Sequence, residues 1–469
     1  MSYSRNSSQY ERMADTPVPR LVTRLAIPSI ITMLVNNLYN LVDTAFVGRL
    51  GTSASGAVGV VFGFMSIIQA FGFMMGQGSG SIVSRAFGRK DPETSNLYAT
   101  AGFFGSFALG LLITVTGFVF LDAIVMFLGS TETIAPFAKT YITYILIAAP
   151  FMCSSLTLNN LLRYEGKAFL GMIGLMSGAV LNMIGDPILM FGFGLGIAGA
   201  GISTAVSQFI AWGVLLYMFL SGRTESRLSM ARLKQAGPAV YWSIMSTGFP
   251  SLIRQLLHSL NAVLLNLHCA PYGDAAVAAM SIVSRIIFFT FSTAVGIAQG
   301  FQPVSAFNYG AGKYSRVRKG YAFSMAASVG VMIVGCTLIL IFSKNLIGLF
   351  RDDPAVIEVG TRALRLQAGA YMLLPLSMIT EMLFQSTGRR MEASFLSALR
   401  SGLLFIPAIL ILSKLRGLAW IQEAQPLALV LCVPIALLFA LRFFRRLPKE
   451  DMPVQNTPPC GQPQNNPDR

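Results

Sequence analysis

Charged side chains are scarce in this sequence. Asp, Glu, Lys and Arg make up 12% of its 469 residues and hydrophobic residues make up 54%, whereas a soluble domain carries about 25% charged residues. The mean hydropathy of +0.62 agrees with that deficit. There is too little polar surface to keep a protein of this size in water, so most of its surroundings must be lipid. Lipid offers the backbone no hydrogen bonds, which leaves helices or a closed barrel, and the long unbroken apolar runs favour helices.

Histidine and cysteine are also scarce, which excludes several kinds of chemistry. The two histidines and five cysteines match no zinc site and no disulfide framework. No Ser–His pair, His–Asp pair or cluster of metal ligands is evident. We therefore expect no enzyme, no cofactor and no metal beyond a coupling ion. Most of the cysteines are interpreted as small buried residues, namely Cys153, Cys269, Cys336 and Cys432, whereas Cys460 lies in the C-terminal tail.

Apolar runs long enough to cross a bilayer recur twelve times along the chain. Each crossing needs roughly 20 such residues, so we expect an all-α polytopic membrane protein with twelve transmembrane helices in two pseudo-symmetric six-helix bundles. The expected spans are 21–47, 55–82, 95–121, 134–161, 168–192, 196–220, 241–270, 275–305, 320–343, 361–386, 393–413 and 420–443.

The basic residues predict the orientation of the chain. The formal net charge is +15, and Lys and Arg gather in the short segments that lie on the N-terminal side of the predicted membrane. Cytoplasmic loops carry this excess, so we expect both termini in the cytoplasm, a plasma (inner) membrane location and no nucleic-acid partner. The expected divisions are a cytoplasmic N-terminal segment (1–20), an N-lobe (21–222), a basic cytoplasmic linker (223–240), a C-lobe (241–446) and a disordered cytoplasmic tail (447–469).

An internal repeat links the two halves of the chain. A shift of 222 residues places Pro28 on Pro250, Gln77 on Gln299 and Gly88 on Gly310 without a gap. Each half then holds six spans, so both halves begin on the same side of the membrane. This arrangement is typical of transporters whose two bundles are related by an axis along the membrane normal and move about a central cavity.

Several short motifs carry a family resemblance. The first span contains Ala26-Ile27-Pro28-Ser29, Tyr39-Asn40-Leu41-Val42-Asp43-Thr44 and Phe46-Val47-Gly48; the fourth ends with Leu162-Arg163; the fifth contains Leu181-Asn182 and Asp186-Pro187, followed by Gly196-Ile197-Ala198-Gly199-Ala200. In this order, over about residues 15–445, the chain resembles the multidrug and toxic compound extrusion (MATE) family, in its MepA-like bacterial branch. The resemblance implies two lobes around a V-shaped cavity and export of cationic drugs or dyes in exchange for H⁺ or Na⁺.

The resemblance also implies an ion site in the N-lobe, formed by Asp43, Asn182, Asp186 and Thr204, with Tyr39 one turn before Asp43. The sequence supports it independently. A charged side chain inside a membrane costs several kcal/mol, about 2.5–3.5 even on insertion scales, and persists with a partner or a function. Two converging carboxyls in a low dielectric cannot both ionise cheaply, so the pair is expected to bind a proton or, with the Asn and Thr oxygens, Na⁺. The alternatives are an Asp43 that reaches water at the end of its span and an Asp186 that caps a helix before Pro187.

Further polar residues within the spans are candidates for substrate binding. Asn36, Asn40 and Asp43 share one helix face by their spacing. Glu381 is either a substrate-facing acid or the ion-pair partner of Arg254 or Arg285. In a related branch an acid stands at the position of His258, and its replacement here favours proton coupling; packing is the simpler interpretation of this histidine. Gln77 and Gln299 are repeat equivalents that either bind substrate or join helices.

Two rival transporters remain at this point. A major-facilitator protein would have an Asp at the position of Ser84 in its loop signature. A lipid-linked oligosaccharide flippase would have a strongly cationic cavity, which Asp43, Asp186 and Glu381 oppose but Arg254 and Arg285 allow. For the favoured exporter we expect small cationic molecules and the lipid bilayer as partners, and a monomeric state.

Overall fold

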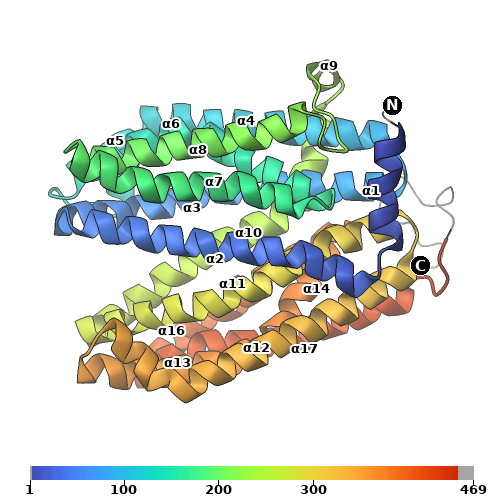
Figure 1. Ribbon diagram of the computed structural model, residues 1–469. Helices are drawn as coiled ribbons and strands as arrows, with labels where there is room; N and C mark the ends of the chain where they lie inside the picture. Colours follow the sequence, from blue (N-terminus) through green and yellow to red (C-terminus); the bar gives the residue numbers. More distant parts are fainter. Residues whose placement is uncertain (1–2, 453–469) are drawn as a thin grey trace.

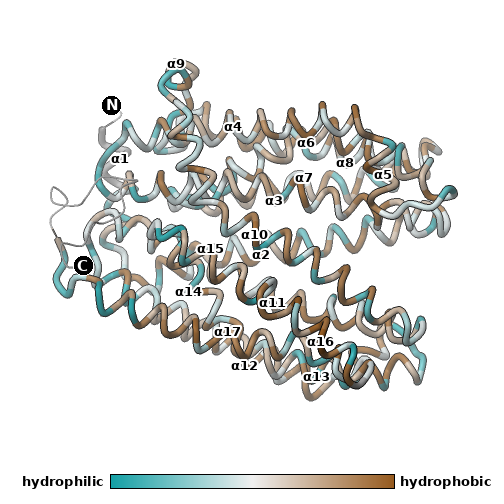
Figure 2. Tube along the Cα trace, turned by 180° about the vertical axis from the view of Figure 1, so that it is seen from behind, coloured by the Kyte–Doolittle hydropathy of each residue, from teal (hydrophilic) through white to brown (hydrophobic). Residues whose placement is uncertain are grey.

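The computed structural model describes residues 3–452, which contain helices and no strand. Two helical bundles lie beside each other (Figure 1). They are in contact at the end where both termini lie and diverge toward the opposite end, and the view from behind in Figure 2 agrees. We call the end with the termini the closed end.

The N-lobe contains six long helices, as expected. They are α2 (Val18–Gly48), α3 (Thr52–Gly88), α4 (Pro92–Val119), α6 (Ala135–Tyr164), α7 (Ala168–Pro187) and α8 (Gly196–Leu220), with the short α5 (Leu121–Phe127) after α4 and a π-helical turn η1 (Ile188–Gly192) after α7. Their tightest core surrounds α3 and α6, where small residues allow close packing: a Cβ on Gly72 would lie 3.2 Å from the carbonyl oxygen of Cys153.

The C-lobe repeats this arrangement with more interruptions. It contains α10 (Pro238–Cys269), η2 (Ala270–Tyr272), α11 (Asp274–Gly310), α12 (Tyr314–Phe350), α13 (Pro354–Tyr371), α14 (Leu374–Thr387), α15 (Arg390–Ala398), η3 (Leu399–Leu404), α16 (Phe405–Arg416) and α17 (Leu418–Arg446). Ten helical segments of the described chain are long and apolar enough to cross a membrane. Adding α10 and the broken pair α13–α14, which are less apolar or shorter, gives the twelve expected passes.

The span expected as one helix at 361–386 is two helices. It breaks at Met372 and Leu373, because Pro375 in the first turn of α14 has no N–H and its ring opposes the carbonyl four residues earlier. Two other spans depart from regular α-helix in π-helical turns: one follows Pro187, and the other lies in the span expected at 393–413. The number of crossings was predicted correctly, but these interruptions were not.

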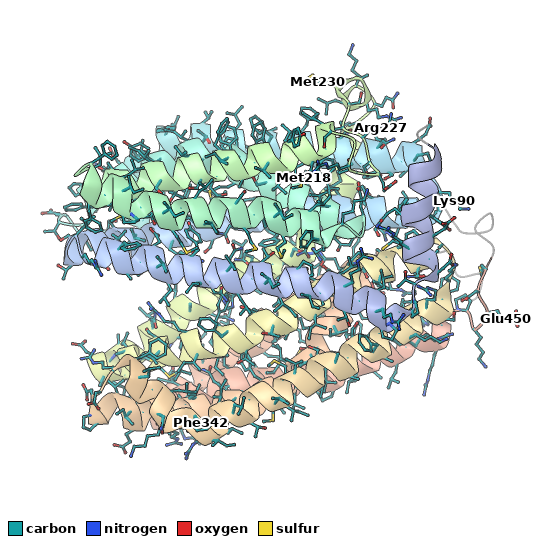
Figure 3. The ribbon with its side chains drawn as sticks, viewed as in Figure 1. Lys90, Met218, Arg227, Met230, Phe342 and Glu450 are labelled. Atoms are coloured by element: carbon teal, nitrogen blue, oxygen red, sulfur yellow. The ribbon has the colours of Figure 1, made fainter. Side chains whose placement is uncertain are left out.

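The outer surface of the bundles is apolar. On α12 the side chains of Leu349, Val334 and Phe342 are 83%, 63% and 50% exposed, and Phe342 projects away from the bundle (Figure 3). Hydrophilic segments gather instead at the two ends of the bundles (Figure 2), and Lys90, Arg227 and Glu450 lie at or near the closed end (Figure 3). This distribution fits a protein whose sides face lipid.

Two segments outside the expected spans are ordered at the closed end. Within 1–20, α1 (Tyr3–Asp15) packs across both lobes: the Tyr10 ring contacts Phe87 of α3 and Phe307 of α11. The linker 223–240 includes α9 (Met230–Leu233). Its backbone N–H groups at Glu225 and Ser226 donate to the buried Glu165 at 2.8 and 2.9 Å.

Only the first residues of the predicted disordered tail lie in the part of the chain that the structure describes. Its residues 447–452 contact the C-lobe, since Asp451 accepts hydrogen bonds from both the backbone and the hydroxyl of Ser315. The expectation of disorder is therefore wrong for these six residues. Residues 453–469 lie outside the part of the chain that the structure describes.

Glycines bring the two lobes into backbone contact. A Cβ on Gly78 would lie 2.2 Å from the carbonyl oxygen of Ile244, and one on Gly300 would lie 2.5 Å from the backbone nitrogen of Ala26. The two glycines are repeat equivalents, so the same contact occurs twice, once from each lobe. The 222-residue shift in the sequence therefore appears in the structure as a pseudo-twofold seam between the lobes.

We expect Gly78→Ala to destabilise the seam by about 1–3 kcal/mol, because the added methyl group has no room beside backbone atoms. Gly59→Ala on the same helix is the matched control, since nothing lies within 4 Å of its Cβ position. Thermal unfolding in detergent should show a lower midpoint for Gly78→Ala only. Equal midpoints for both variants would contradict the backbone contact.

Candidate functional site

Three neighbouring helices bring the predicted ion-site residues together in the N-lobe. Tyr39 and Asp43 lie on α2, Asn182 and Asp186 on α7, and Thr204 on α8. All five side chains are buried, with exposures between 0% and 9%. Spacings of four residues on α2 and on α7 place both members of each pair on one helix face. Asp43 is buried and does not extend to the outer surface, and Asp186 accepts from the Asn182 side chain and from no backbone N–H of the described residues.

The Asn182 side chain organises this cluster. Its amide nitrogen lies 3.1 Å from Oδ1 of Asp186, 3.2 Å from Oγ1 of Thr204 and 3.3 Å from Oγ of Ser203. The Ser203 hydroxyl in turn donates to the backbone carbonyl of Asn182 at 3.3 Å. The amide nitrogen has two N–H donors, which these three oxygens already share, so the remaining oxygens of the cluster must find other partners.

The carboxyl groups of Asp43 and Asp186 lie close enough to each other to interact electrostatically. Oδ1 of Asp43, Oδ2 of Asp186 and Oδ1 of Asn182 are nevertheless buried without a hydrogen-bond partner among the described residues. Two neighbouring carboxyls repel unless a proton or a cation lies between them. Of the cluster's side chains, three acceptor oxygens and one donor, the Tyr141 hydroxyl, lack a partner among the described residues, and this excess of acceptors suits a proton or a hard cation. The described residues hold no group of three His, Cys, Asp or Glu side chains of the kind that binds a transition metal.

Two further residues belong to this cluster. Ser203 precedes Thr204 and contacts Asn182. The hydroxyl of Tyr141 on α6 is buried beside the cluster, without a hydrogen-bond partner among the described residues. In the sequence, Ser203 is marked only by its position beside Thr204. Tyr141 carries no mark at all, because the sequence of α6 does not indicate that this residue packs beside α2 and α7.

The predicted acid of the C-lobe is engaged in an ion pair. Glu381 on α14 is 2% exposed and pairs with Nη1 of Arg254 on α10, while the hydroxyl of Ser397 on α15 donates to the same carboxylate oxygen at 2.6 Å. The structure therefore realises the ion-pair alternative for Glu381, with Arg254 as partner. Arg285 is exposed on α11 and makes no ion pair among the described side chains.

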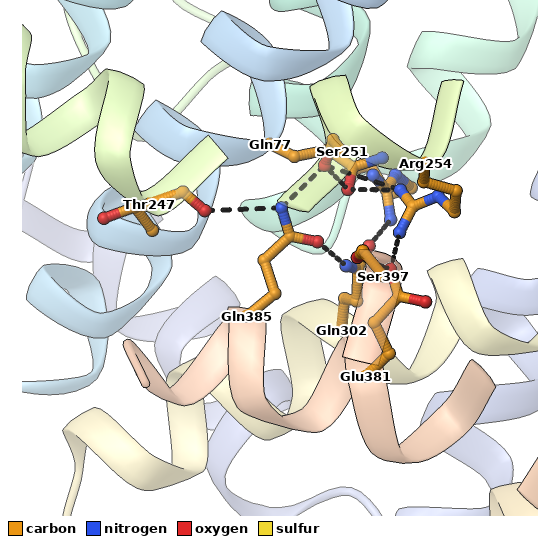
Figure 4. Close-up of polar contacts among 9 residues, drawn as sticks. Gln77, Thr247, Ser251, Arg254, Gln302, Glu381, Gln385 and Ser397 are labelled. Atoms are coloured by element: carbon orange, nitrogen blue, oxygen red, sulfur yellow. Dashed lines mark hydrogen bonds and ion pairs between the residues drawn. The ribbon is translucent and has the colours of Figure 1, made fainter. Parts of the chain in front are cut away.

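A buried chain of hydrogen bonds continues from this pair across the seam (Figure 4). Oε1 of Gln77 on α3 accepts from Ser251 at 2.7 Å and from Arg254 at 3.2 Å. Gln385 on α14 donates to Ser251 at 2.6 Å and accepts from Gln302 on α11 at 3.2 Å. Gln77 thus ties the N-lobe to the C-lobe at the closed end.

The other predicted substrate residues lie apart from one another. The ring of His258 is exposed and stacks on Phe288 and Phe291, with centroids 5.8 and 5.9 Å away. Asn36 lines a recess at the lobe seam together with Gln299, whereas Asn40 lies one turn further along α2, half-buried. The structure does not gather these residues into one pocket.

A family model described as MatE matches residues 28–188 and again residues 250–411, about two thirds of the chain. The chain belongs to the MatE family. The two matches begin 222 residues apart, so the repeat read from Pro28 and Pro250 is the repeat of the family model. The expected family and fold class are confirmed, and the chain is a multi-pass membrane transporter.

Relatives and solved structures match nearly the whole chain. The multidrug export protein MepA of Staphylococcus aureus strain N315 is 28% identical over 436 residues, which cover 92% of this chain and 95% of the relative. The protein of the same name from Staphylococcus haemolyticus is 25% identical over 434 residues, with the same coverage of both chains. A structure described as the outward-facing conformation of a multidrug resistance MATE family transporter matches 92% of this chain and 98% of its own with a TM-score of 0.87 at 24% identity. That likeness shows the fold.

We expect the Arg254–Glu381 pair to stabilise the C-lobe. Removing one partner leaves a buried charge unpaired, so Glu381→Gln should cost about 3–5 kcal/mol and Arg254→Met/Glu381→Met less than the two single changes together. Thermal unfolding in detergent measures this. The exposed pair Arg362–Glu423 is the control, whose removal should cost about 0–1 kcal/mol; similar losses at both pairs would refute a stabilising role.

Proposed function

We propose that this MatE-family transporter exports cationic organic molecules by exchanging them for protons at the Asp43–Asp186 pair. The observation that carries the proposal is the set of unpartnered acceptor oxygens on Asp43, Asp186 and Asn182, buried in a lipid-facing protein. A buried cluster with an excess of acceptors is stable with a proton or a cation present and unfavourable without one. Occupancy by the coupling proton and occupancy by a cationic cargo therefore oppose each other.

The exchange follows from charge. A proton on the pair removes negative potential from the N-lobe interior and loosens a bound cation, whereas a bound cation favours loss of the proton. The coupling is reciprocal, because two ligands that share one site must each lower the affinity for the other. The multidrug export proteins named above are consistent with such cargo.

Protons are favoured over Na⁺ by the closeness of the two carboxyl groups. Two neighbouring carboxyl oxygens are bridged by one proton without other ligands, whereas Na⁺ needs several oxygens around it. His258, which is exposed, also occupies the position at which a related branch has an acid. The C-lobe therefore has one carboxylate fewer that could bind Na⁺. Na⁺ coupling is the other outcome of the gradient experiment below.

The closed end carries both termini, α1 and the basic loop residues, so it faces the cytoplasm under the positive-inside rule. The lobes diverge toward the opposite side (Figure 1). The conformation described here is accordingly the outward-facing one, in which cargo leaves and protons enter.

We expect Asp43→Asn and Asp186→Asn each to reduce efflux of a cationic dye by about tenfold or more, a loss of at least about 1.4 kcal/mol of coupling. Asp122→Asn is the control, since its side chain is 80% exposed in an ion pair with Lys139 between α5 and α6. Initial efflux rates from cells that express equal amounts of each variant measure the effect. Undiminished efflux by both variants of the pair would remove the proposed site.

Purified protein in liposomes should move the dye uphill under an imposed pH gradient with Na⁺ absent. An imposed Na⁺ gradient at equal pH on both sides should not drive it. Dye movement driven only by Na⁺ would assign the acceptor oxygens to that ion, and movement with neither gradient would indicate a passive pathway.

A further inference from the structure

Arg163 occupies an unusual electrostatic position at the lobe seam. It lies near the end of α6, is 3% exposed, and no carboxylate of the described residues lies within 4 Å of its guanidinium. Its three hydrogen bonds go to neutral acceptors: the backbone carbonyl of Gln299 at 2.7 Å, Oε1 of Gln302 at 3.0 Å and the side-chain oxygen of Asn160. Burying a cation without an anionic partner costs several kcal/mol.

The nearest charged neighbours do not neutralise it. Arg254 is the other guanidinium whose charge acts on Arg163, and its own charge is balanced by Glu381. The interior beneath the acid pair of the N-lobe thus holds one uncompensated positive charge.

Arg163 lines a recess with a free volume of about 20 Å³. One water-sized group needs about 10–15 Å³, so the recess accepts a single small polar group and not a whole organic molecule. Its other lining residues are all uncharged, namely Ser29, Thr32, Met33, Asn36, Phe73, Leu156, Asn159, Asn160, Ala168, Leu175 and Gln299.

The recess offers hydrogen-bond donors. Two N–H groups of Arg163, on Nε and on Nη2, have no acceptor among the described residues, and the amides of Asn36 and Asn159 make no hydrogen bond there. The hydroxyls of Ser29 and Thr32 already donate to their own helix. Free donors around an uncompensated cation are the reverse of the acid pair, where free acceptors surround a negative charge.

The recess and the acid pair lie along the same two helices. Ser29, Asn36 and Asp43 follow one another on α2 at intervals of seven residues. Ala168, Leu175 and Asn182 do the same on α7. Seven residues of helix rise about 10 Å. The two sites are therefore separated by roughly 10 Å along one face of the N-lobe interior.

We propose that the Arg163 recess binds a small anionic group, with the carboxylate of a zwitterionic cargo as its ligand, while the cationic part of that cargo faces the Asp43–Asp186 pair. Carboxylates bind guanidinium forks with charge-assisted hydrogen bonds, which are stronger than neutral ones. The inference rests on the proposed export function. A free inorganic anion has the same chemistry as the carboxylate, and the experiment separates the two.

The test compares rhodamine 110, which has a free carboxylate, with rhodamine 123, which is its methyl ester. Binding of each dye to purified protein, followed by fluorescence anisotropy, should weaken about tenfold for rhodamine 110 in Arg163→Gln and by less than about twofold for rhodamine 123. Arg163→Lys should restore part of the preference. Equal weakening for both dyes would overturn the proposal.

A second variant protects the test against misfolding, since Arg163 also joins the lobes. Asn36→Asp leaves the three hydrogen bonds of Arg163 in place and adds a carboxylate to the recess. It should weaken rhodamine 110 about tenfold and leave rhodamine 123 unchanged or tighter. Unchanged binding of rhodamine 110 in this variant would also overturn the proposal.

Two further measurements separate the sources of the anion and the two proposals. Replacing chloride by gluconate should leave rhodamine 110 binding unchanged or tighter; if chloride is instead required for rhodamine 123 binding, the ligand is an inorganic anion and the cargo carboxylate is refuted. If a pH gradient drives no efflux but Arg163→Gln still weakens only rhodamine 110, proton exchange is refuted and the recess proposal stands. If a pH gradient drives efflux but Arg163→Gln affects both dyes equally, proton exchange stands and the recess proposal is refuted.

Discussion

Every polar group inside a protein surrounded by lipid must have a partner, because water is not available to replace one. Buried polar atoms without a partner among the described residues are scattered over both lobes, for example on Trp212, Thr247 and Gln422. At two places such groups surround a charge. The Asp43–Asp186 cluster has an excess of acceptors and the Arg163 recess has donors without an acceptor, so a ligand of opposite character lowers the free energy at each.

At the seam between the lobes, lipid supplies no hydrophobic driving force for association. Glycines such as Gly78 and Gly300 let backbones approach closely, so van der Waals contact replaces an apolar driving force that lipid does not supply. Hydrogen bonds that cross the seam include those from Ser251 and Arg254 to Gln77 and those from Arg163 to Gln299 and Gln302. In each of them the acceptor is neutral, so opening the seam separates no ion pair at these positions, which would cost much more.

The sequence predicted most of the architecture because its signals are local or periodic. The apolar runs gave the crossings, and the constant offset between Pro28 and Pro250 gave the two lobes. Four-residue spacing predicted only that Asn182 and Asp186 share one face, whereas the pairing of Asp43 with Asp186 was implied by the family resemblance. Tyr141 and the partner of Glu381 were not predictable in the same way. Both depend on which helices pack together. Sequence spacing alone could not show whether Arg254 or Arg285 pairs with Glu381.

The helix α2 links the ion site to the seam. It holds Asp43 inside the N-lobe, and the same helix meets the C-lobe through Asn37, whose amide donates to Ser292 at 2.7 Å, and through the backbone at Ala26 beneath Gly300. The other carboxyl, Asp186, lies on α7, within the same lobe. A rigid rotation of the lobes would therefore leave the carboxyl pair intact and change only the far face of α2. Ion occupancy can influence the seam only if α2 itself shifts or bends, and Pro28, which lacks the N–H of a regular helical turn, lies between Asp43 and the seam contact at Ala26.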